Sequence, residues 1–474
     1  MAGRSRRHLL VSLVLGLLVV DARPAAANGR FPLANQIAFS PADSNLVVLR
    51  TTFGVLVSHD SGASWQWICE SAIGIGTAQE DPTYGITQTN AIVGALWQGL
   101  SVSPDVGCTW AFGAGALAKQ RMVDLVVRAD APDTTLALTG NWMAPGADGG
   151  GDASTGTYDS RVLMSADDGA SWNQLGTPID PAVVVTTIEV AKGDPSRIYV
   201  SGVRGVGPSR TASLFVSDDK GTTWTERPTP FAPDVETAIY IAAVDPSDAD
   251  LVYVRTDGPS RLLVTADAGK TFSLPTFQAP DGGVEATLSG YMFGFALSPD
   301  GSKIYVGGVS DGVFMASKGA TTFAHQSSLG VQCLAARGAE LWACSAETTG
   351  GFIAGVSVDD GASFSPKLHL NGVDGVLQCA PGATVDQCQA QLPTLCPKLG
   401  GCVGYDSGAP AGGDAGEALP SDGGADAEPP VTPPATPPKG GCSVPGTSGL
   451  EGFTALLLFG GAATFRRRKR PSGG

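Results

Sequence analysis

Histidine and basic residues are scarce in this chain of 474 residues. It has four histidines, and 30 Lys and Arg stand against 45 Asp and Glu, which gives a net charge of −15. That acidic excess disfavours nucleic acid as a partner, because nucleic-acid binding needs basic patches. A Ser-His-Asp triad would have to use His325 or His369, and neither lies near a nucleophile motif. The sequence also lacks long amphipathic helical patterns, which disfavours helical repeats.

The chain does contain a recurring octapeptide of the form Ser/Thr-x-Asp-x-Gly-x-Ser/Thr-aromatic. Its six intact copies begin at Ser58, Ser103, Ser165, Ser217, Thr265 and Ser357. A seventh, degenerate copy runs from Ala316 to Phe323 and carries Lys318 in place of the Asp and Ala320 in place of the Gly. The copies start 41–62 residues apart. Such a period is typical of propellers and solenoids.

Each octapeptide follows a short apolar run, as Leu262-Leu263-Val264 precedes Thr265. This pattern predicts a strand that ends in a hairpin turn. The Asp side chain can accept hydrogen bonds from turn N–H groups, the Gly allows a positive φ, and the aromatic residue starts the next strand. We therefore predict a structural role, without catalysis, for six residues: Asp60, Asp105, Asp167, Asp219, Asp267 and Asp359.

A second turn signal, such as Asp245-Pro246-Ser247, lies upstream of most copies between two apolar runs. One unit thus holds four strands, which in the fifth unit are expected at residues 238–244, 251–255, 261–264 and 271–277. Four-stranded units repeated around an axis form a β-propeller. The sequence therefore predicts an all-β fold, a seven-bladed propeller over residues 28–370.

The octapeptide resembles the Asp-box, or BNR repeat, of sialidases, sortilin-type receptors, xyloglucan-degrading enzymes and photosystem assembly factors. The similarity covers about residues 31–370 and implies a propeller of the sialidase or sortilin-like type. It says little about activity, because the families that share the repeat bind and cleave unrelated molecules.

Both ends of the chain have features of export and sorting. Residues 1–27 combine basic residues, an apolar run and Ala25-Ala26-Ala27, which is typical of a signal peptide by the general secretory or twin-arginine route. Residues 403–440 are rich in Gly, Pro and acid and are expected to be a disordered linker. Residues 441–474 hold Cys442, a short apolar stretch and a final arginine cluster.

This C-terminal arrangement resembles the MYXO-CTERM sorting tail. The resemblance implies processing near Cys442 by sorting machinery and display on the outer surface of a Gram-negative cell. A plain C-terminal anchor in the inner membrane, formed by a short transmembrane helix, is the alternative, in which case the propeller would be periplasmic.

The remaining cysteines suggest disulfides, as expected for an exported protein. Cys333 and Cys344 flank a turn and could pair across a hairpin, and Cys69 and Cys108 could link the first two units. A small cysteine-rich segment at 371–402 holds Cys379, Cys388, Cys396 and Cys402, whose connectivity the spacing leaves open. These spacings do not favour zinc, so we expect disulfide bonds and no metal.

Both kinds of turn are expected at one end of the propeller, so ligand binding is expected at the opposite end. The ligand-binding candidates there are Arg50, Trp142, Tyr158, Arg204, Arg255 and Tyr291. No cofactor is expected, although the carboxylates of Asp148, Asp152 and Asp159 leave calcium open in one loop. Arg30-Phe31-Pro32 is a loose echo of a sialidase arginine triplet, but nothing assigns catalytic residues.

The leading hypothesis is a non-catalytic, surface-tethered and monomeric binding propeller. It would recognise a glycan or an envelope or extracellular protein through the end opposite the octapeptides. A secreted glycoside hydrolase of the sialidase type is the first alternative, so an enzymatic activity stays open. An assembly factor for envelope proteins is the second alternative.

Overall fold

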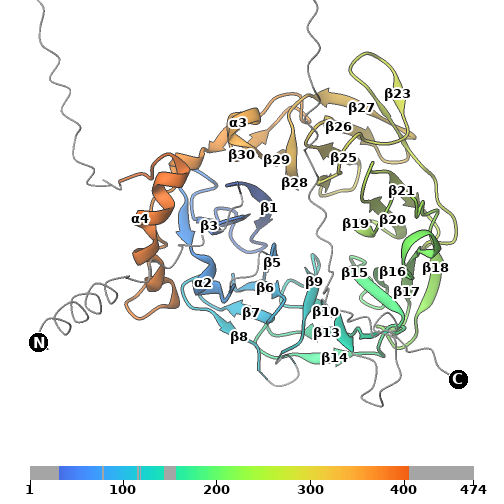
Figure 1. The fold of residues 1–474 in the computed structure, drawn as a ribbon, viewed down its shortest axis with the longest axis horizontal. Coiled ribbons are helices and arrows are strands. Elements are labelled where there is room, and N and C mark those ends of the chain that lie inside the picture. Colours follow the sequence, from blue (N-terminus) through green and yellow to red (C-terminus); the bar gives the residue numbers. More distant parts are fainter. Residues whose placement is uncertain (1–30, 77–79, 115–116, 118, 144–155, 405–474) are drawn as a thin grey trace, which may run out of the picture. The chain divides into compact units, whose positions relative to one another are not determined.

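Seven antiparallel sheets, the blades, follow one another around a central axis, with the first strand of each blade innermost (Figure 1). The computed structural model describes residues 31–76, 80–114, 117, 119–143 and 156–404. The predicted all-β, seven-bladed propeller is thereby confirmed.

From the innermost strand outward, the strands of each blade follow chain order, apart from β22 (Thr276–Gln278) and β23 (Val284–Glu285) at the edge of blade 6. Blade 1 comprises β1 (Ala34–Phe39), β2 (Val47–Thr51), β3 (Gly54–Ser58) and β4 (Gln66–Ile68), and blade 2 comprises β5 (Thr83–Ile86), β6 (Ile92–Leu96), β7 (Gly99–Ser103) and β8 (Ala111–Phe112). Blade 3 comprises β9 (Met122–Val127), β10 (Thr135–Thr139), β13 (Val162–Ser165) and β14 (Asn173–Leu175). Blade 4 comprises β15 (Val183–Val190), β16 (Ile198–Arg204), β17 (Thr211–Ser217) and β18 (Thr225–Pro228). A ribbon of β11 (Asn141–Met143) and β12 (Thr157–Asp159) extends from blade 3.

Blade 5 comprises β19 (Ile239–Asp245), β20 (Asp248–Thr256) and β21 (Leu262–Thr265). Blade 6 comprises β24 (Gly294–Leu297), β25 (Lys303–Gly308), β26 (Gly312–Ser317) and β27 (Thr322–Ser327), with β22 and β23 added at its edge. Blade 7 comprises β28 (Val331–Arg337), β29 (Glu340–Ser345), β30 (Ala354–Ser357) and β31 (Ser365–Leu368). The helices are short: α2 (Glu70–Ile73), η4 (Gly207–Ser209), α3 (Glu347–Gly350), η5 (Leu370–Gly372), η6 (Thr384–Gln391), α4 (Leu392–Leu395) and η7 (Cys396–Leu399).

In five of the seven blades, backbone hydrogen bonds join the turn after the first strand to the octapeptide turn of the same blade. In blade 1, Ser61 N donates to Asn45 O, and in blade 5 Ala268 N donates to Asp250 O. Blades 3, 4 and 6 have the matching bonds Asp168 to Asp133, Lys220 to Ser196 and Lys318 to Ser302. Both kinds of turn therefore lie at one end of the ring, the octapeptide face. The loops between second and third strands lie at the other end, the far face.

The intact octapeptides close their turns with a shared set of hydrogen bonds. In the first copy, Asp60 Oδ1 accepts from Ser64 N at 2.8 Å and Asp60 Oδ2 accepts from Ser64 Oγ at 2.6 Å. The Ser58 hydroxyl donates to Asp60 Oδ1 and accepts from Gly62 N. Positive φ is found at Gly62 as expected, and also at the preceding Ser61. These carboxylates are thus occupied within their own turns.

The degenerate copy in blade 6 uses its lysine to join two blades. Lys318 Nζ lies 2.8 Å from Asp245 Oδ1, which belongs to the Pro turn of blade 5 and whose side chain is fully buried. A buried carboxylate needs such a partner, since an uncompensated charge away from water is costly. The Asp-to-Lys change therefore converts a contact within a turn into a contact between blades.

The prediction of a fourth strand for blade 5 at residues 271–277 is wrong. Only Ser273 bridges to Val264, after which the chain leaves the sheet and β22 pairs in parallel with β27 of blade 6. By the register of this bridge, Pro275 would stand opposite Leu262. Proline has no N–H for the next ladder bond, so the strand cannot continue there.

Polar side chains on the innermost strands link neighbouring blades. Gln36 of β1 donates to Tyr84 O and accepts from Tyr84 N in blade 2. Asp124 of β9 accepts from Ile188 N of blade 4 at 3.1 Å. These side chains satisfy backbone groups at the inner edges of the sheets, where no further strand can pair.

Blade 7 meets blade 1 through an arginine and two aromatic rings. The Arg337 guanidinium lies 4.7 Å from the Phe39 ring centroid and 5.4 Å from the Trp342 ring centroid, and Arg337 Nη1 donates to Ser44 O at 2.7 Å. Phe39 and Trp342 pack edge to face with centroids 5.7 Å apart. No strand is exchanged between these blades, so side chains must hold the ring closed here.

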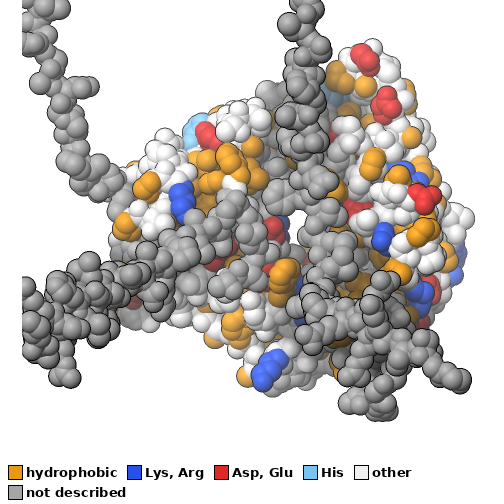
Figure 2. Space-filling view, in the orientation of Figure 1, with side chains coloured by type: hydrophobic (Ala, Val, Ile, Leu, Met, Phe, Trp, Pro, Cys, Tyr) orange, Lys and Arg blue, Asp and Glu red, His pale blue; other side chains and the backbone are white. Residues whose placement is uncertain are grey.

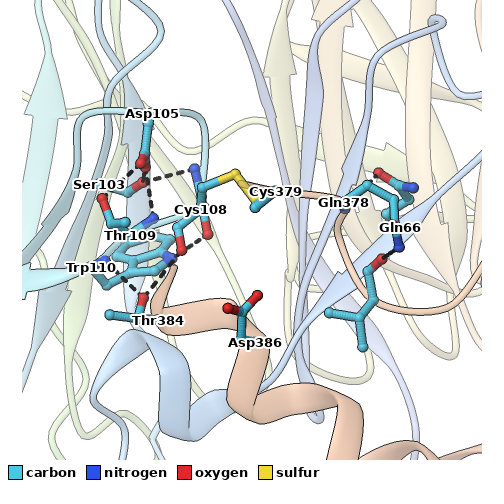
Figure 3. The surroundings of a disulfide bond; sticks show 12 residues. Gln66, Ser103, Asp105, Cys108, Thr109, Trp110, Gln378, Cys379, Thr384 and Asp386 are labelled. Carbon is cyan, nitrogen blue, oxygen red and sulfur yellow. Dashed lines mark hydrogen bonds between the residues drawn. A yellow bond between two sulfur atoms is a disulfide. The ribbon is translucent and has the colours of Figure 1, made fainter. Parts of the chain in front are cut away.

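The segment that follows blade 7 adds a covalent clasp to this closure. Val376 forms a parallel bridge with Trp67 at the edge of β4, and Trp67 N donates to Gly375 O at 2.8 Å. Disulfides then join Cys69 to Cys388 and Cys108 to Cys379, the bond that Figure 3 shows. We call residues 373–402 the C-terminal clasp.

The predicted Cys69–Cys108 pair is therefore wrong, because each of these cysteines bonds to the clasp instead. The hairpin pair Cys333–Cys344 is confirmed, and Cys396 pairs with Cys402. Blades 1 and 2 are joined through a segment that lies about 300 residues later, which local spacing could not indicate.

Several predictions fall outside the described residues: the signal peptide 1–27, most of the linker 403–440, and the tail 441–474 with Cys442. Within the described part of the chain, no helix is long and apolar enough to span a bilayer.

Removing the octapeptide carboxylate of blade 2 should destabilise the protein. Asp105 accepts from Thr109 N and Thr109 Oγ1, both at 2.7 Å. We expect Asp105→Ala to lower the free energy of unfolding by about 1–2 kcal/mol, because these donors lose their partner. Urea unfolding measures the change, with the exposed Asp234→Ala as control.

The effect of Asp105→Ala should also depend on pH. Burial opposes ionisation, but hydrogen bonds from Thr109 and Ser103 hold the pKa of Asp105 below its usual 3.8. The stabilisation is present above that value and is lost as the pH falls through the lower pKa of the folded state. A difference between variant and wild type that persists unchanged at pH 2 would contradict this assignment.

Breaking the clasp should cost more than breaking a local disulfide. Cys108 and Cys379 are 271 residues apart, whereas Cys396 and Cys402 are 6 apart. Because Cys69–Cys388 stays closed in the double Ser variant of the first pair, the loop released there is the 39 residues from Cys69 to Cys108 plus the 9 residues from Cys379 to Cys388. Loop-closure entropy then predicts a loss of about 4 kcal/mol for the first pair and about 2 kcal/mol for the second. Denaturant unfolding of both double variants tests this, and equal losses would argue against a clasp.

Candidate binding site on the far face

Large apolar side chains are exposed mainly on the far face. Eight of them lie in far-face loops or blade connections: Trp97, Trp142, Met143, Val206, Val235, Tyr291, Phe293 and Val309. Among the described residues, the octapeptide turns expose one large apolar side chain, Val358. Exposed apolar groups that gather on one face indicate an interaction surface.

Two of the three candidate arginines are already engaged by the protein. Arg50 donates to Asn35 Oδ1 at 2.6 Å and to the carbonyls of Asp81 and Pro82, so it fixes the connection between blades 1 and 2. Arg204 forms ion pairs with Asp180 and Glu226 within blade 4, at 3.2 and 3.1 Å. The three arginines therefore do not converge on one point, because their partners hold them on separate blades.

Arg255 stands apart, since it stacks on an aromatic ring. Its guanidinium carbon lies 4.5 Å from the Tyr240 ring centroid. Two residues earlier on the same strand, Tyr253 packs against Phe295 of blade 6, so this side of β20 faces blade 6. Burial lowers the pKa of Arg255 and raises the pKa of Tyr240. A guanidinium over a tyrosine face is stabilised by the ring's negative charge distribution.

Tyr291 and Phe293 form an exposed pair of stacked rings in the connection between blades 5 and 6. Their centroids are 5.5 Å apart with an interplanar angle of 29°. They are 42% and 44% exposed, which is high for rings that the fold holds in contact. Met292, which lies between them in the chain, donates its N–H to the hydroxyl of Ser260 in the loop that follows β20, the strand of Arg255.

The loop that carries these rings is firmly held. Ser260 N donates to Gly290 O, Ser260 O accepts from Leu288 N at 2.9 Å, and the Ser260 hydroxyl accepts from Met292 N at 2.9 Å. Asp311 Oδ1 accepts from the N–H and the hydroxyl of Ser289, both at 2.7 Å. The rings therefore form a preorganised platform, which lowers the entropy cost of binding.

A cavity of about 210 Å³ lies between the β22–β23 ribbon and blade 6. Phe277, Phe314 and Leu288 give it an apolar lining, and Glu285 and Asp311 add carboxylates. We call the cavity together with Tyr240, Arg255, Tyr291, Phe293 and Val309 the blade 5–6 strip. Asp311, which lines the cavity, lies in the same loop between β25 and β26 as Val309.

A larger cavity, of about 440 Å³, lies on the octapeptide face between blades 6 and 7. Its polar groups contact one another: Lys303 Nζ lies 2.7 Å from Asp360 Oδ1, which also accepts from the Tyr305 hydroxyl at 2.6 Å. These contacts join the two blades, so size alone does not make this cavity the better binding site.

The two remaining candidates lie on the ribbon that extends from blade 3. Trp142 and Tyr158 stand opposite each other on β11 and β12, and Trp142 is 54% exposed. Asp159 forms an ion pair with Arg161 at 2.7 Å. The calcium candidates Asp148 and Asp152 lie outside the described residues, and the described part of the chain has no cluster of three possible metal ligands.

Sequence reasoning missed several far-face residues. Trp97 lies in a tight turn between β6 and β7, and the Arg121 guanidinium stacks on its ring at 4.7 Å. Tyr240 and Phe293 were also missed. A tryptophan in a two-residue turn between apolar strands is a signal that could have been recognised, because such a turn offers little to bury its ring.

Two acidic side chains lie on the innermost strands of neighbouring blades, and Figure 2 shows acidic groups beside the central opening. Asp124 and Glu189 belong to the innermost strands of blades 3 and 4. Burial raises the pKa of Asp124 to about 6. Burial and the nearby charge of Asp124 raise the pKa of Glu189 to about 8. Two carboxyl groups with separated pKa values can serve as acid and base.

No family model and no curated protein matches the chain. Its fold is similar to a GH74 enzyme of Niastella koreensis (TM-score 0.37, 13% identity, covering 70% of this chain and 65% of that one). It is also similar to a puromycin-hydrolyzing peptidase of Mycobacterium tuberculosis (0.47, 14%, 73% and 55%) and to Kuenenia stuttgartiensis hydrazine synthase (0.45, 11%, 71% and 98%). The chain spans less than two thirds of that GH74 enzyme. At these identities the likeness concerns the fold alone.

Replacing Glu189 with Gln should change how stability depends on pH. Because the pKa of Glu189 is raised from 4.5 to about 8, its stabilisation is complete below pH 4.5 and is lost as the pH rises through 8. We expect Glu189→Gln to match wild type near pH 4.5 and to be more stable at pH 9. The raised pKa alone would give about 5 kcal/mol, and the partial exposure of Glu189 to water reduces this to about 1–2 kcal/mol. Thermal unfolding across this range measures it, and parallel profiles would contradict the raised pKa.

Proposed function

We propose that the protein is a non-catalytic binding propeller that recognises a glycan through the blade 5–6 strip. The observation that carries this proposal is the rigid, exposed pair Tyr291 and Phe293 on the far face. Aromatic faces offer a sugar ring an apolar surface, while neighbouring polar groups fix its orientation. Hydroxyls and carboxylates around the adjacent cavity, such as Ser310 and Glu285, supply hydrogen-bonding partners for sugar hydroxyls.

The proposed function also implies a location outside the cytoplasm. Four disulfides among the described residues support an exported protein, because such bonds persist in oxidising surroundings. We propose that the tail at 441–474 tethers a monomeric propeller to the cell surface, where a binding face would meet extracellular glycans.

A glycoside hydrolase is the second candidate function, and the separated pKa values of Asp124 and Glu189 are the observation that favours it. A Glu189 that keeps its proton near neutral pH could act as a general acid, with Asp124 as its ionised neighbour. A glycan panel tested for both binding and cleavage separates the two functions. Cleavage that is lost in Glu189→Gln would establish the enzyme and overturn the non-catalytic proposal.

The stacked rings should dominate glycan affinity. We expect Tyr291→Ala and Phe293→Ala each to weaken binding about tenfold on a glycan array followed by calorimetry, as for a contact worth about 1.4 kcal/mol. Phe112, which is 43% exposed on the outer strand β8, provides a control of matched exposure. Glycan binding that survives both substitutions, or equal loss in Phe112→Ala, would contradict the assignment of the strip.

A further inference from the structure

Most arginines of the described chain have partners that compensate their charge or satisfy their donors. Eight of the eleven form ion pairs or donate side-chain hydrogen bonds: Arg50, Arg128, Arg161, Arg197, Arg204, Arg210, Arg261 and Arg337. Among the described residues, Arg121, Arg227 and Arg255 have no such partner. In a chain of net charge −15, carboxylates are plentiful, so an unpaired arginine requires an explanation.

Arg255 is unpaired although acidic side chains lie near it. Asp257 is occupied by Thr237 N at 2.6 Å, by Ala238 N at 2.8 Å and by the Thr237 hydroxyl. Asp124 lies on another blade and accepts from Ile188 N. Both carboxylates are thus held away from Arg255 by backbone donors.

The surroundings of Arg255 make its guanidinium suitable for binding an anion. It is half-buried, and its guanidinium lies over the Tyr240 ring, which orients the plane of its donors. A charge that is partly removed from water and left without a counter-ion gains strongly when a ligand supplies one. A guanidinium held in a plane also suits bidentate contact with a carboxylate or sulfate.

Arg121 repeats this arrangement on the same face. Its guanidinium stacks on the exposed ring of Trp97, and none of the described carboxylates pairs with it. Arg227, by contrast, lies on the outer strand β18. The unpaired and ring-stacked arginines of the described chain are therefore both on the far face.

We propose that Arg255 binds the carboxylate or sulfate group of an acidic glycan whose sugar ring lies on Tyr291 and Phe293. This inference rests on the proposed glycan-binding function and narrows it to anionic glycans. The protein's own negative charge repels polyanions at long range, so recognition depends on the local arginine and not on a basic surface.

Calorimetry on the purified full-length protein tests this proposal with three probes: a uronic acid oligosaccharide, its neutral methyl ester and a sulfated oligosaccharide. We expect the wild type to bind one of the acidic probes at least tenfold more tightly than the neutral ester. Arg255→Gln should remove that preference and leave binding of the neutral ester unchanged. Arg255→Lys should restore only part of it, because lysine lacks the planar fork.

The matched control is Arg204→Gln, which removes an arginine from the end of another second strand of the far face. Its ion pairs with Asp180 and Glu226 already use its charge, so the preference for acidic probes should persist. Circular dichroism establishes that each variant is folded.

Two outcomes overturn the inference, and they are distinguishable. If acidic and neutral probes bind equally and Tyr291→Ala weakens both, Arg255 is not an anion receptor, but the glycan-binding function stands. If none of the probes binds and the glycan array is also negative, the proposed function fails together with the inference. The acidic probe that the wild type binds more tightly than the neutral ester shows whether the bound group is a carboxylate or a sulfate.

Discussion

Closure of the ring is the constraint on which the rest of the structure depends. Blade 1 and blade 7 exchange no strand, so the join rests on the Arg337 stack and on the clasp that bonds to Cys69 and Cys108. Every blade packs on two neighbours only when the ring is closed. The blade 5–6 strip is such an interface between two blades, and its geometry is fixed only when all seven are held in place.

The octapeptide predicted the fold because its chemistry is local. Asp60 accepts hydrogen bonds from Ser64, only four residues away, so the whole turn is encoded by eight consecutive residues and can be recognised in the sequence. The pairing of Cys69 with Cys388 could not be predicted in this way, because it depends on which segments meet after closure. The missing fourth strand of blade 5 was in principle readable, since Pro275 removes a donor that the ladder needs.

The candidate site was predictable in part. Arg255 and Tyr291 were predicted on the far face from topology, but sequence could not show that Arg204 and Arg50 are already paired. Nor could it show that Tyr240 lies under the Arg255 guanidinium, because that contact depends on the register between β19 and β20. Spacing locates a loop, while the partner of a side chain is decided by tertiary packing.

The two faces divide the work of the molecule. Carboxylates on the octapeptide face bind within their own turns or pair with lysines of a neighbouring blade, whereas the far face presents stacked rings and an arginine without an ion-pair partner among the described residues. Hydrogen exchange of the protein with and without a bound glycan tests this division most directly. We expect slower exchange at residues 286–293 and at the end of β20, with unchanged exchange in the octapeptide turns. Protection of the octapeptide turns, with none in the blade 5–6 strip, would contradict it.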